Sequence, residues 1–290
     1  MRLPFLVLSP VCVLLGLATA VWTGHEINLF YLSLAFIGAV TAHISVNALN
    51  EYDDFRSGLD LKTEPTPFSG GSKSLPKNPQ KANVALATGL VALLITAAIG
   101  IYFWTIRGIW ILPLGLLGLI VIFTYTKWLT KNPFLCLIAP GLGFGPLMVM
   151  GTDFILTGSY SWSAFIASLV PFFLVSDLLL LNQFPDVEAD QSIGRKHFPI
   201  LLGTRASVKI YTLFLAGAYL ALIAGFATGR LPLAGLLGLA TVLIAIPTVK
   251  GVAQHYQSIP DLIPFMGRNV VLNIITPVLV AAGIFLNVWL

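Results

Sequence analysis

Residues 82–104 read ANVALATGLVALLITAAIGIYFW, a run of 23 residues without a charged side chain. An α-helix rises about 1.5 Å per residue, so a helix of this length is long enough to cross the hydrocarbon core of a bilayer. A soluble helix of this composition would have no polar face to turn toward water. The stretch therefore predicts a transmembrane helix.

Eight further apolar runs of similar length occur in the chain of 290 residues, which is 57% hydrophobic and only 10% charged. Soluble domains carry about 25% charged residues, so the composition excludes a soluble, disordered or disulfide-scaffold protein. The sequence predicts an all-α, polytopic membrane protein with nine transmembrane helices in a single membrane-embedded domain over 1–290. The predicted spans are 4–22, 28–50, 82–104, 108–127, 134–156, 161–184, 206–227, 232–249 and 269–289.

The basic residues indicate how the bundle is oriented. With the N-terminus in the cytoplasm, all of the 16 Lys and Arg residues except Arg107 and Arg230 lie on the cytoplasmic side. Positive charge concentrates on that side of multi-pass proteins. We therefore expect a cell inner membrane protein with a cytoplasmic N-terminus, a C-terminus on the opposite side, and cytoplasmic loops at 51–81 and 185–205. Its basic face favours anionic lipid or a diphosphate ligand and does not imply nucleic acid. The first apolar run resembles a signal peptide, but eight spans follow it, so we expect it to stay as the first helix.

Acidic residues gather in the two long polar loops. The first cluster follows Asn50 and includes Asp54, and the second follows Asn182 and includes Asp186. In both, the Asn precedes the Asp by four residues, a spacing that places the two side chains on one helix face. The sequence therefore predicts two matched polar helix ends on the same side of the membrane.

Clustered carboxylates repel one another unless a cation holds them together. Mg²⁺ prefers oxygen ligands and is commonly bound by carboxylates together with substrate phosphates. Basic side chains near the clusters are suited to the outer phosphate oxygens: Arg56, Lys62, Lys73, Arg195 and Lys196. The pattern predicts a Mg²⁺-dependent diphosphate site at the membrane surface.

On these motifs the chain resembles the UbiA superfamily of intramembrane prenyltransferases. The first motif runs from Asn50 through Asp54 to Asp60, and the second reads Asp186-Val187-Glu188-Ala189-Asp190. The extension Gly58-Leu59-Asp60 is similar to the 1,4-dihydroxy-2-naphthoate branch, which implies a role in menaquinone biosynthesis. Glu51 and Pro185 depart from the usual residues of the motifs and bear on the choice of acceptor.

The resemblance implies transfer of a polyprenyl group from a polyprenyl diphosphate to an aromatic ring, with the isoprenoid tail among the helices. It implies Mg²⁺ ligands at Asn50, Asp54, Asp60, Asp186 and Asp190. It places catalytic roles on Asp54, Asp186, Lys73, Tyr125 and Asn182. It places substrate contacts on Asn47, Asn50, Arg56, Lys62, Arg195, Lys196 and Asp177.

Several residues carry two interpretations. His43 either helps to deprotonate an acceptor or is hydrogen-bonded between helices, and Asp177 either contacts the acceptor or pairs with an Asn. Tyr125 is either a site residue or an interfacial anchor. His197 and Asp153 are expected in loops or at the interface.

Two alternatives concern the function itself. The acceptor of a UbiA-type enzyme could instead be 4-hydroxybenzoate, homogentisate, a tetrapyrrole or a glycerol-phosphate lipid. A membrane transporter is the alternative of another class, and it would be expected to carry charges at mid-membrane depth on broken helices.

Overall fold

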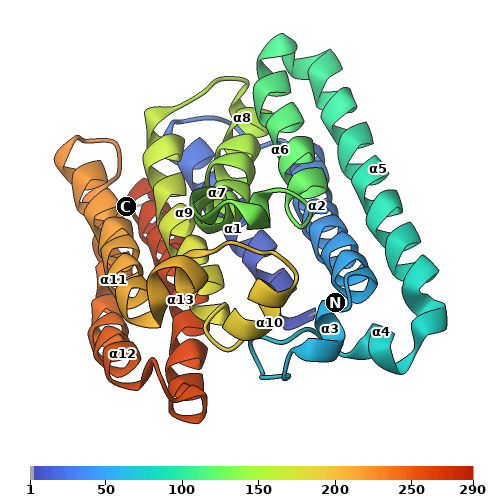
Figure 1. The fold of residues 1–290 in the computed structure, drawn as a ribbon. Helices are drawn as coiled ribbons and strands as arrows, with labels where there is room; N and C mark the ends of the chain where they lie inside the picture. Colours follow the sequence, from blue (N-terminus) through green and yellow to red (C-terminus); the bar gives the residue numbers. More distant parts are fainter. Residues whose placement is uncertain (1–2, 290) are drawn as a thin grey trace.

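The computed structural model describes residues 3–289, and all of its regular elements in that range are helical (Figure 1). Arg2, which contributes to the charge bias, lies outside the described residues. The long helices are α1 (Leu8–Trp22), α2 (Leu29–Arg56), α5 (Ala82–Arg107), α6 (Leu112–Thr124), α9 (Trp162–Asn182), α11 (Phe198–Ala227), α12 (Val242–His255) and α13 (Ile259–Trp289).

A further spanning segment is composite. It begins as α7 (Pro133–Leu142), continues through the π-helical turn η5 (Gly143–Met150) and ends as α8 (Gly151–Thr157). A 3₁₀ segment, η6 (Leu233–Thr241), likewise leads into α12. Three short helices lie together with the polar loops at one end of the bundle: α3 (Leu59–Lys62), α4 (Ser74–Lys77) and α10 (Val187–Ser192).

The predicted all-helical membrane fold is confirmed. Within the described range, eight helical segments are long and apolar enough to cross a membrane, and the shorter apolar helix Ile109–Thr124 occupies the place of the predicted span 108–127. Several helices extend beyond their predicted limits: α2 ends at Arg56, α5 at Arg107 and α12 at His255, whereas α11 begins at Phe198 and α13 at Ile259. Backbone hydrogen bonds continue a helix into polar sequence, whereas hydropathy marks only its apolar part.

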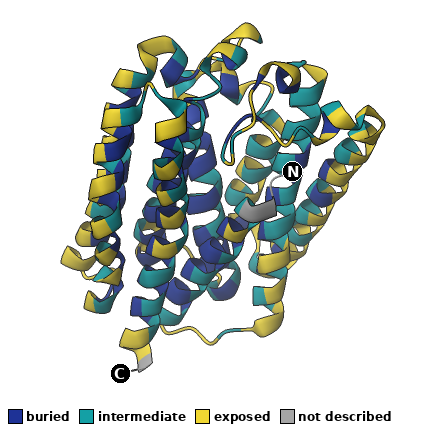
Figure 2. Ribbon diagram, turned by 90° about the horizontal axis from the view of Figure 1, so that it is seen from below, coloured by how far each residue is buried: buried dark blue, intermediate teal, exposed yellow. Residues whose placement is uncertain are grey.

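The bundle has a clear centre and periphery. In the most apolar stretch of α9, 67% of the residues are buried. In the most apolar stretch of the helical segment Pro79–Arg107, which contains α5, only 11% are buried. Figure 2 shows the same gradient, with buried residues gathered inside the bundle and exposed residues on the outer helices. We infer that α5 presents its apolar side chains to lipid and that α9 forms the core of the protein.

Small residues allow the composite segment to approach α9 closely. A Cβ atom added at Gly141 would lie 2.1 Å from the carbonyl oxygen of Phe172, and one added at Gly145 would lie 2.4 Å from that of Ser168. Membrane helices pack closely where small residues let their backbones meet. These two glycines therefore set the distance between α9 and one wall of the bundle.

We expect Gly141→Ala to lower the thermal stability of the detergent-solubilised protein. The added methyl group would overlap the Phe172 backbone, which cannot move without shifting α9, and such overpacking costs about 1–3 kcal/mol. The control is Gly143→Ala, two residues along the chain, where an added Cβ meets nothing within 4 Å. Equal melting temperatures for the two variants would contradict the prediction.

Candidate functional site

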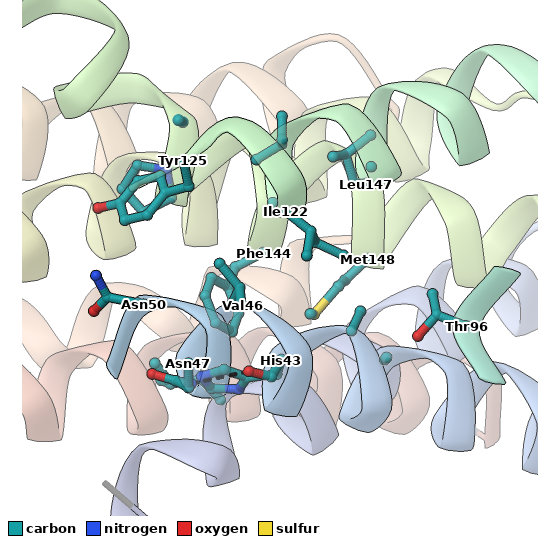
Figure 3. A pocket seen from close by; sticks show the side chains of 18 of the residues that line it. His43, Val46, Asn47, Asn50, Thr96, Ile122, Tyr125, Phe144, Leu147 and Met148 are labelled. Carbon is teal, nitrogen blue, oxygen red and sulfur yellow. Dashed lines mark hydrogen bonds between the residues drawn. The ribbon is translucent and has the colours of Figure 1, made fainter. Parts of the chain in front are cut away.

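A cavity of about 730 Å³ opens at the end of the bundle that carries the polar loops. Polar side chains from α2, α10 and the loops line its mouth, whereas apolar residues of α5, α6 and η5 line its depth. In Figure 3, Asn50 and Tyr125 lie at one end of the labelled group, Thr96 lies at the other, and His43 and Phe144 lie between them. The space can thus accept a molecule with a polar head and an apolar tail.

Both acidic motifs line this one cavity. Asn50 and Asp54 project from the last turns of α2, and Asp60 follows on α3. Asp186 is the N-cap residue of α10, Asp190 lies within that helix, and both line the same cavity. The two motifs, more than 120 residues apart in sequence, therefore form a single site, and Asp60 and Asp190 are buried in it.

Arg195 joins the two motifs directly. Its Nη1 donates to Asp190 Oδ1 at 2.8 Å, and its Nη2 donates to Asp54 Oδ1. Burial alone would lower the pKa of Arg195, but Asp54 and Asp190 raise it more strongly, so the net pKa lies above its usual range. The guanidinium therefore stays charged and balances one of the two negative charges that Asp54 and Asp190 carry when both are ionised.

His197 also belongs to the site. It lies in the loop just before α11, as expected, but it is not a surface residue. It is 2% exposed and lines the cavity, and its Nε2 lies 3.0 Å from Asp190 Oδ2. Asp190 is thus held on both oxygens, by Arg195 and by His197. The sequence offers only the short distance from Asp190 as a hint, because the chain must turn back before His197 can reach that carboxylate.

The segment between α3 and α4 covers the mouth of the cavity. The backbone N–H of Gly70 donates to Asp186 Oδ2 at 2.9 Å, and Ser72 Oγ donates to Glu51 Oε1. Lys62 Nζ donates to Ser192 Oγ of α10 at 3.0 Å. This segment, residues 63–73, is called the covering loop below, and it ties the first motif to the second.

Lys73 holds the covering loop. Its ammonium donates to the carbonyl oxygens of Asp60 and Thr63 and, at 2.9 Å, to Thr63 Oγ1. It is not among the described residues that line the cavity. In this conformation Lys73 therefore stabilises the loop, and a direct contact with substrate would require it to leave three oxygen partners.

Other predicted substrate contacts also lie away from the cavity lining. Arg56, Lys62 and Lys196 are exposed. Asp177 is fully buried within α9, and neither it nor these three basic residues is part of the described lining. The lining does include the remaining predicted residues, Asn47, Tyr125 and Asn182.

Hydrogen bonds orient the two amides of α2. Asn50 Nδ2 donates to Thr126 Oγ1 at 3.1 Å, and Asn47 Nδ2 donates to the carbonyl oxygen of His43 at 3.0 Å. Each amide thereby keeps its oxygen for other partners. Tyr125 also lines the cavity, directly after the end of α6.

We expect Gly71→Ala to lower the activity predicted from the two acidic motifs about tenfold to a hundredfold. Gly71 has a φ of +73°, and a Cβ added there would lie 2.3 Å from Asp60 Oδ1, so the carboxylate must move. The control is Gly58→Ala, which introduces the same backbone strain at φ +75° but meets nothing within 4 Å. If both variants lose activity equally, displacement of Asp60 is not the cause.

The donor atoms at the mouth suit a magnesium ion that arrives with phosphate. No three Asp, Glu, His or Cys side chains of residues 3–289 converge closely enough to hold a metal unaided. However, Mg²⁺ is often held by one or two carboxylates together with substrate phosphates. The ligands here are hard oxygens, and a cationic guanidinium already bridges Asp54 and Asp190. The residues therefore fit the ion in a complex with a diphosphate.

Known enzymes resemble the sequence over most of its length. A 1,4-dihydroxy-2-naphthoate octaprenyltransferase of Bacillus subtilis (strain 168) is 28% identical over 254 residues, which cover 85% of this chain and 78% of that protein. A 2-carboxy-1,4-naphthoquinone phytyltransferase of Synechocystis sp. (strain ATCC 27184 / PCC 6803 / Kazusa) is 24% identical, with coverage of 91% and 83%.

Solved structures share the fold. A UbiA homolog from Aeropyrum pernix K1 in its apo form superposes with a TM-score of 0.74 at 18% identity, over 99% of both chains. A UbiA homolog from Archaeoglobus fulgidus bound to DMAPP and Mg²⁺ superposes with a TM-score of 0.60 at 15% identity, over 96% of this chain and 98% of that one.

The sequence model of the UbiA prenyltransferase family matches residues 9–266, nearly the whole chain. The match includes both acidic motifs and nearly all of the described residues that line the cavity. Together with the apolar spans, it favours an enzyme over a transporter. The chain therefore belongs to the UbiA prenyltransferase family and is an integral membrane prenyltransferase.

Proposed function

We propose that the protein transfers a polyprenyl group from a polyprenyl diphosphate to 1,4-dihydroxy-2-naphthoate, a step of menaquinone biosynthesis, with Mg²⁺ as cofactor. The observation that carries this proposal is the single cavity with both acidic motifs at its mouth and apolar walls in its depth. The mouth suits a diphosphate, and the depth suits an isoprenoid tail.

Asn50, Asp54, Asp60, Asp186 and Asp190 would hold Mg²⁺ at the mouth. When bound, Mg²⁺ acts as a Lewis acid that neutralises the charge of the leaving diphosphate. Arg195 adds a permanent positive charge beside Asp54 and Asp190. The covering loop closes over the mouth and excludes water from the reacting groups.

In the reaction, the allylic C–O bond of the donor breaks, and the diphosphate leaves with the bonding electrons. The Tyr125 ring lines the cavity opposite Asn50, where its π electrons stabilise the allylic cation. The carboxylated carbon of the electron-rich acceptor ring attacks the cation and forms a C–C bond. Loss of CO₂ from the carboxylated ring carbon then restores aromaticity, and the product is a prenylated naphthoquinol.

The purified protein in nanodiscs tests this proposal when it is given a polyprenyl diphosphate and 1,4-dihydroxy-2-naphthoate. We expect a product with the mass of the prenylated ring minus CO₂, loss of activity with a chelator, and recovery with Mg²⁺. Transfer to 4-hydroxybenzoate, homogentisate, a tetrapyrrole or a glycerol-phosphate lipid alone would overturn the choice of acceptor. No transfer to any acceptor would overturn the proposed reaction.

We also propose that the mouth of the cavity faces the cytoplasm and that the protein resides in the inner membrane. Arg107 and Arg230, the two basic residues expected on the opposite side, interact with helix ends far from the acidic motifs. Arg107 donates to the carbonyl oxygens of Ile155 and Leu156, and Trp22 Nε1 donates to that of Arg230. A reporter fused to the C-terminus that is active only outside the cytoplasm is expected to be active, and an inactive fusion would contradict this orientation.

A further inference from the structure

One buried histidine of the cavity, His43, has no role in the proposed binding of Mg²⁺ and diphosphate. His43 lies on α2 one turn before Asn47, is 4% exposed, and lines the cavity. Seven residues, or about 10 Å along the helix, separate it from Asn50 at the mouth. Figure 3 places it between the polar end of the cavity and its apolar depth.

A second helix fixes one nitrogen of the imidazole. Ser9 of α1, which is fully buried, places its hydroxyl 2.9 Å from His43 Nδ1. This contact between helices matches one of the two interpretations that the sequence allows for His43. Because the two ring nitrogens are distinct, a partner at Nδ1 determines what Nε2 can offer.

The other nitrogen faces the cavity. His43 Nε2 has no hydrogen-bond partner among the described residues, and protein atoms do not enclose it. Its apolar neighbours in the lining include Ala39, Ala42 and Val46. A polar atom in such surroundings is stabilised when a ligand supplies the missing hydrogen bond.

The ring plane is also fixed. Phe144 of η5 meets the imidazole edge to face, with ring centroids 4.7 Å apart and planes at 85°. Phe144 itself lines the cavity, and π-helical turns such as η5 are often found at functional sites. His43 thus presents one hydrogen-bonding atom in a fixed direction next to a flat apolar surface, a combination that suits a hydroxylated aromatic ring.

We propose that His43 binds the aromatic acceptor, through a hydrogen bond from Nε2 to a ring hydroxyl or carboxylate, and that Phe144 packs against the ring. This assignment rests on the proposed prenyl transfer and specifies where its acceptor lies. The position of His43 below the acidic motifs puts the acceptor beside the reacting end of the prenyl chain. His43 thereby selects hydroxylated rings over purely apolar molecules.

The experiment measures the KM for acceptor, the KM for donor and the kcat of His43→Leu and His43→Gln. We expect His43→Leu to lower kcat/KM for the acceptor about tenfold to a hundredfold and to leave the donor KM unchanged. His43→Gln keeps a polar group near the position of Nε2 and is expected to recover part of that loss. The control, Thr212→Val, changes an exposed polar residue of α11 that is not among the described residues lining the cavity, and it is expected to leave both constants unchanged.

Ser9→Ala is a second variant that does not touch the cavity. It removes the partner of Nδ1, so we expect a smaller rise in acceptor KM with the same donor KM. If His43→Leu does not fold, this rise alone supports the proposal, and its absence overturns it. An unchanged acceptor kcat/KM in His43→Leu, or equal changes for donor and acceptor, would also overturn it. Failure of the proposed function is distinguishable, because the wild-type protein would then transfer to no aromatic acceptor.

Discussion

Asp186→Asn is expected to lower kcat/KM for prenyl transfer about a thousandfold. The substitution removes a negative charge at the mouth while keeping an oxygen that accepts from the backbone N–H of Gly70, so the covering loop can stay in place. Loss of one preorganised electrostatic group in an active site costs about 10²–10³ in rate, and a proposed metal ligand is expected at the upper end. The measurement is steady-state turnover at saturating acceptor over a range of Mg²⁺ concentrations.

Glu188→Gln is the matched control for this prediction. Glu188 is an acid of α10, two residues after Asp186, but it is exposed and is not among the described residues that line the cavity. Its substitution is expected to leave turnover within about twofold of the wild type, because screened surface charges contribute little. If Asp186→Asn retains more than a tenth of wild-type activity, Asp186 is not a ligand of the catalytic ion.

Arg195→Met is expected to destabilise the protein by about 3–5 kcal/mol in the absence of Mg²⁺. Arg195 and Asp54 have side chains 15% exposed, and that of Asp190 is 5% exposed, so the ion pairs are largely shielded from water. Removing the shared cation leaves two nearly buried carboxylates facing each other, which is strongly destabilising. The measurement is the thermal unfolding of the protein in detergent with and without Mg²⁺.

Two comparisons separate this charge effect from a general loss of packing. Lys196→Met, at the exposed neighbouring residue, is expected to melt like the wild type. The double variant Arg195→Met with Asp190→Asn removes one of the repelling charges and is expected to be more stable than Arg195→Met alone. Mg²⁺ is expected to raise the melting temperature of Arg195→Met more than that of the wild type. If Arg195→Met melts at the wild-type temperature without Mg²⁺, the ion pairs of Arg195 with Asp54 and Asp190 do not stabilise the protein.

The membrane helices could be predicted from the sequence because the length and hydropathy of a single stretch decide whether it spans the bilayer. A charge-free run such as 82–104 specifies a membrane helix by length and transfer free energy alone, whatever packs beside it. The repeated spacing of Asn50 with Asp54 and of Asn182 with Asp186 likewise needs only helix periodicity. The helix ends were less predictable, because α2 continues through polar residues to Arg56 by backbone hydrogen bonds that hydropathy does not register.

The contacts within the site could not be predicted in this way. Lys73 is a cationic residue in a glycine-rich and serine-rich loop, which is typical of a phosphate ligand. The path of the covering loop instead brings its ammonium to backbone oxygens. His197 has the local sequence of a loop residue, but the turn after α10 buries it against Asp190. In each case the partner is chosen by where the backbone passes, and residue type alone does not determine that path.

The sequence by itself thus determined that this is a helical membrane protein with two acidic motifs, since apolar length and motif spacing are properties of neighbouring residues. Only the tertiary structure decided which groups meet. Arg195 reaches Asp54 across 141 positions of the chain, and Ser9 reaches His43 from another helix. Such pairs depend on helix packing, which small residues such as Gly141 set through close backbone contact.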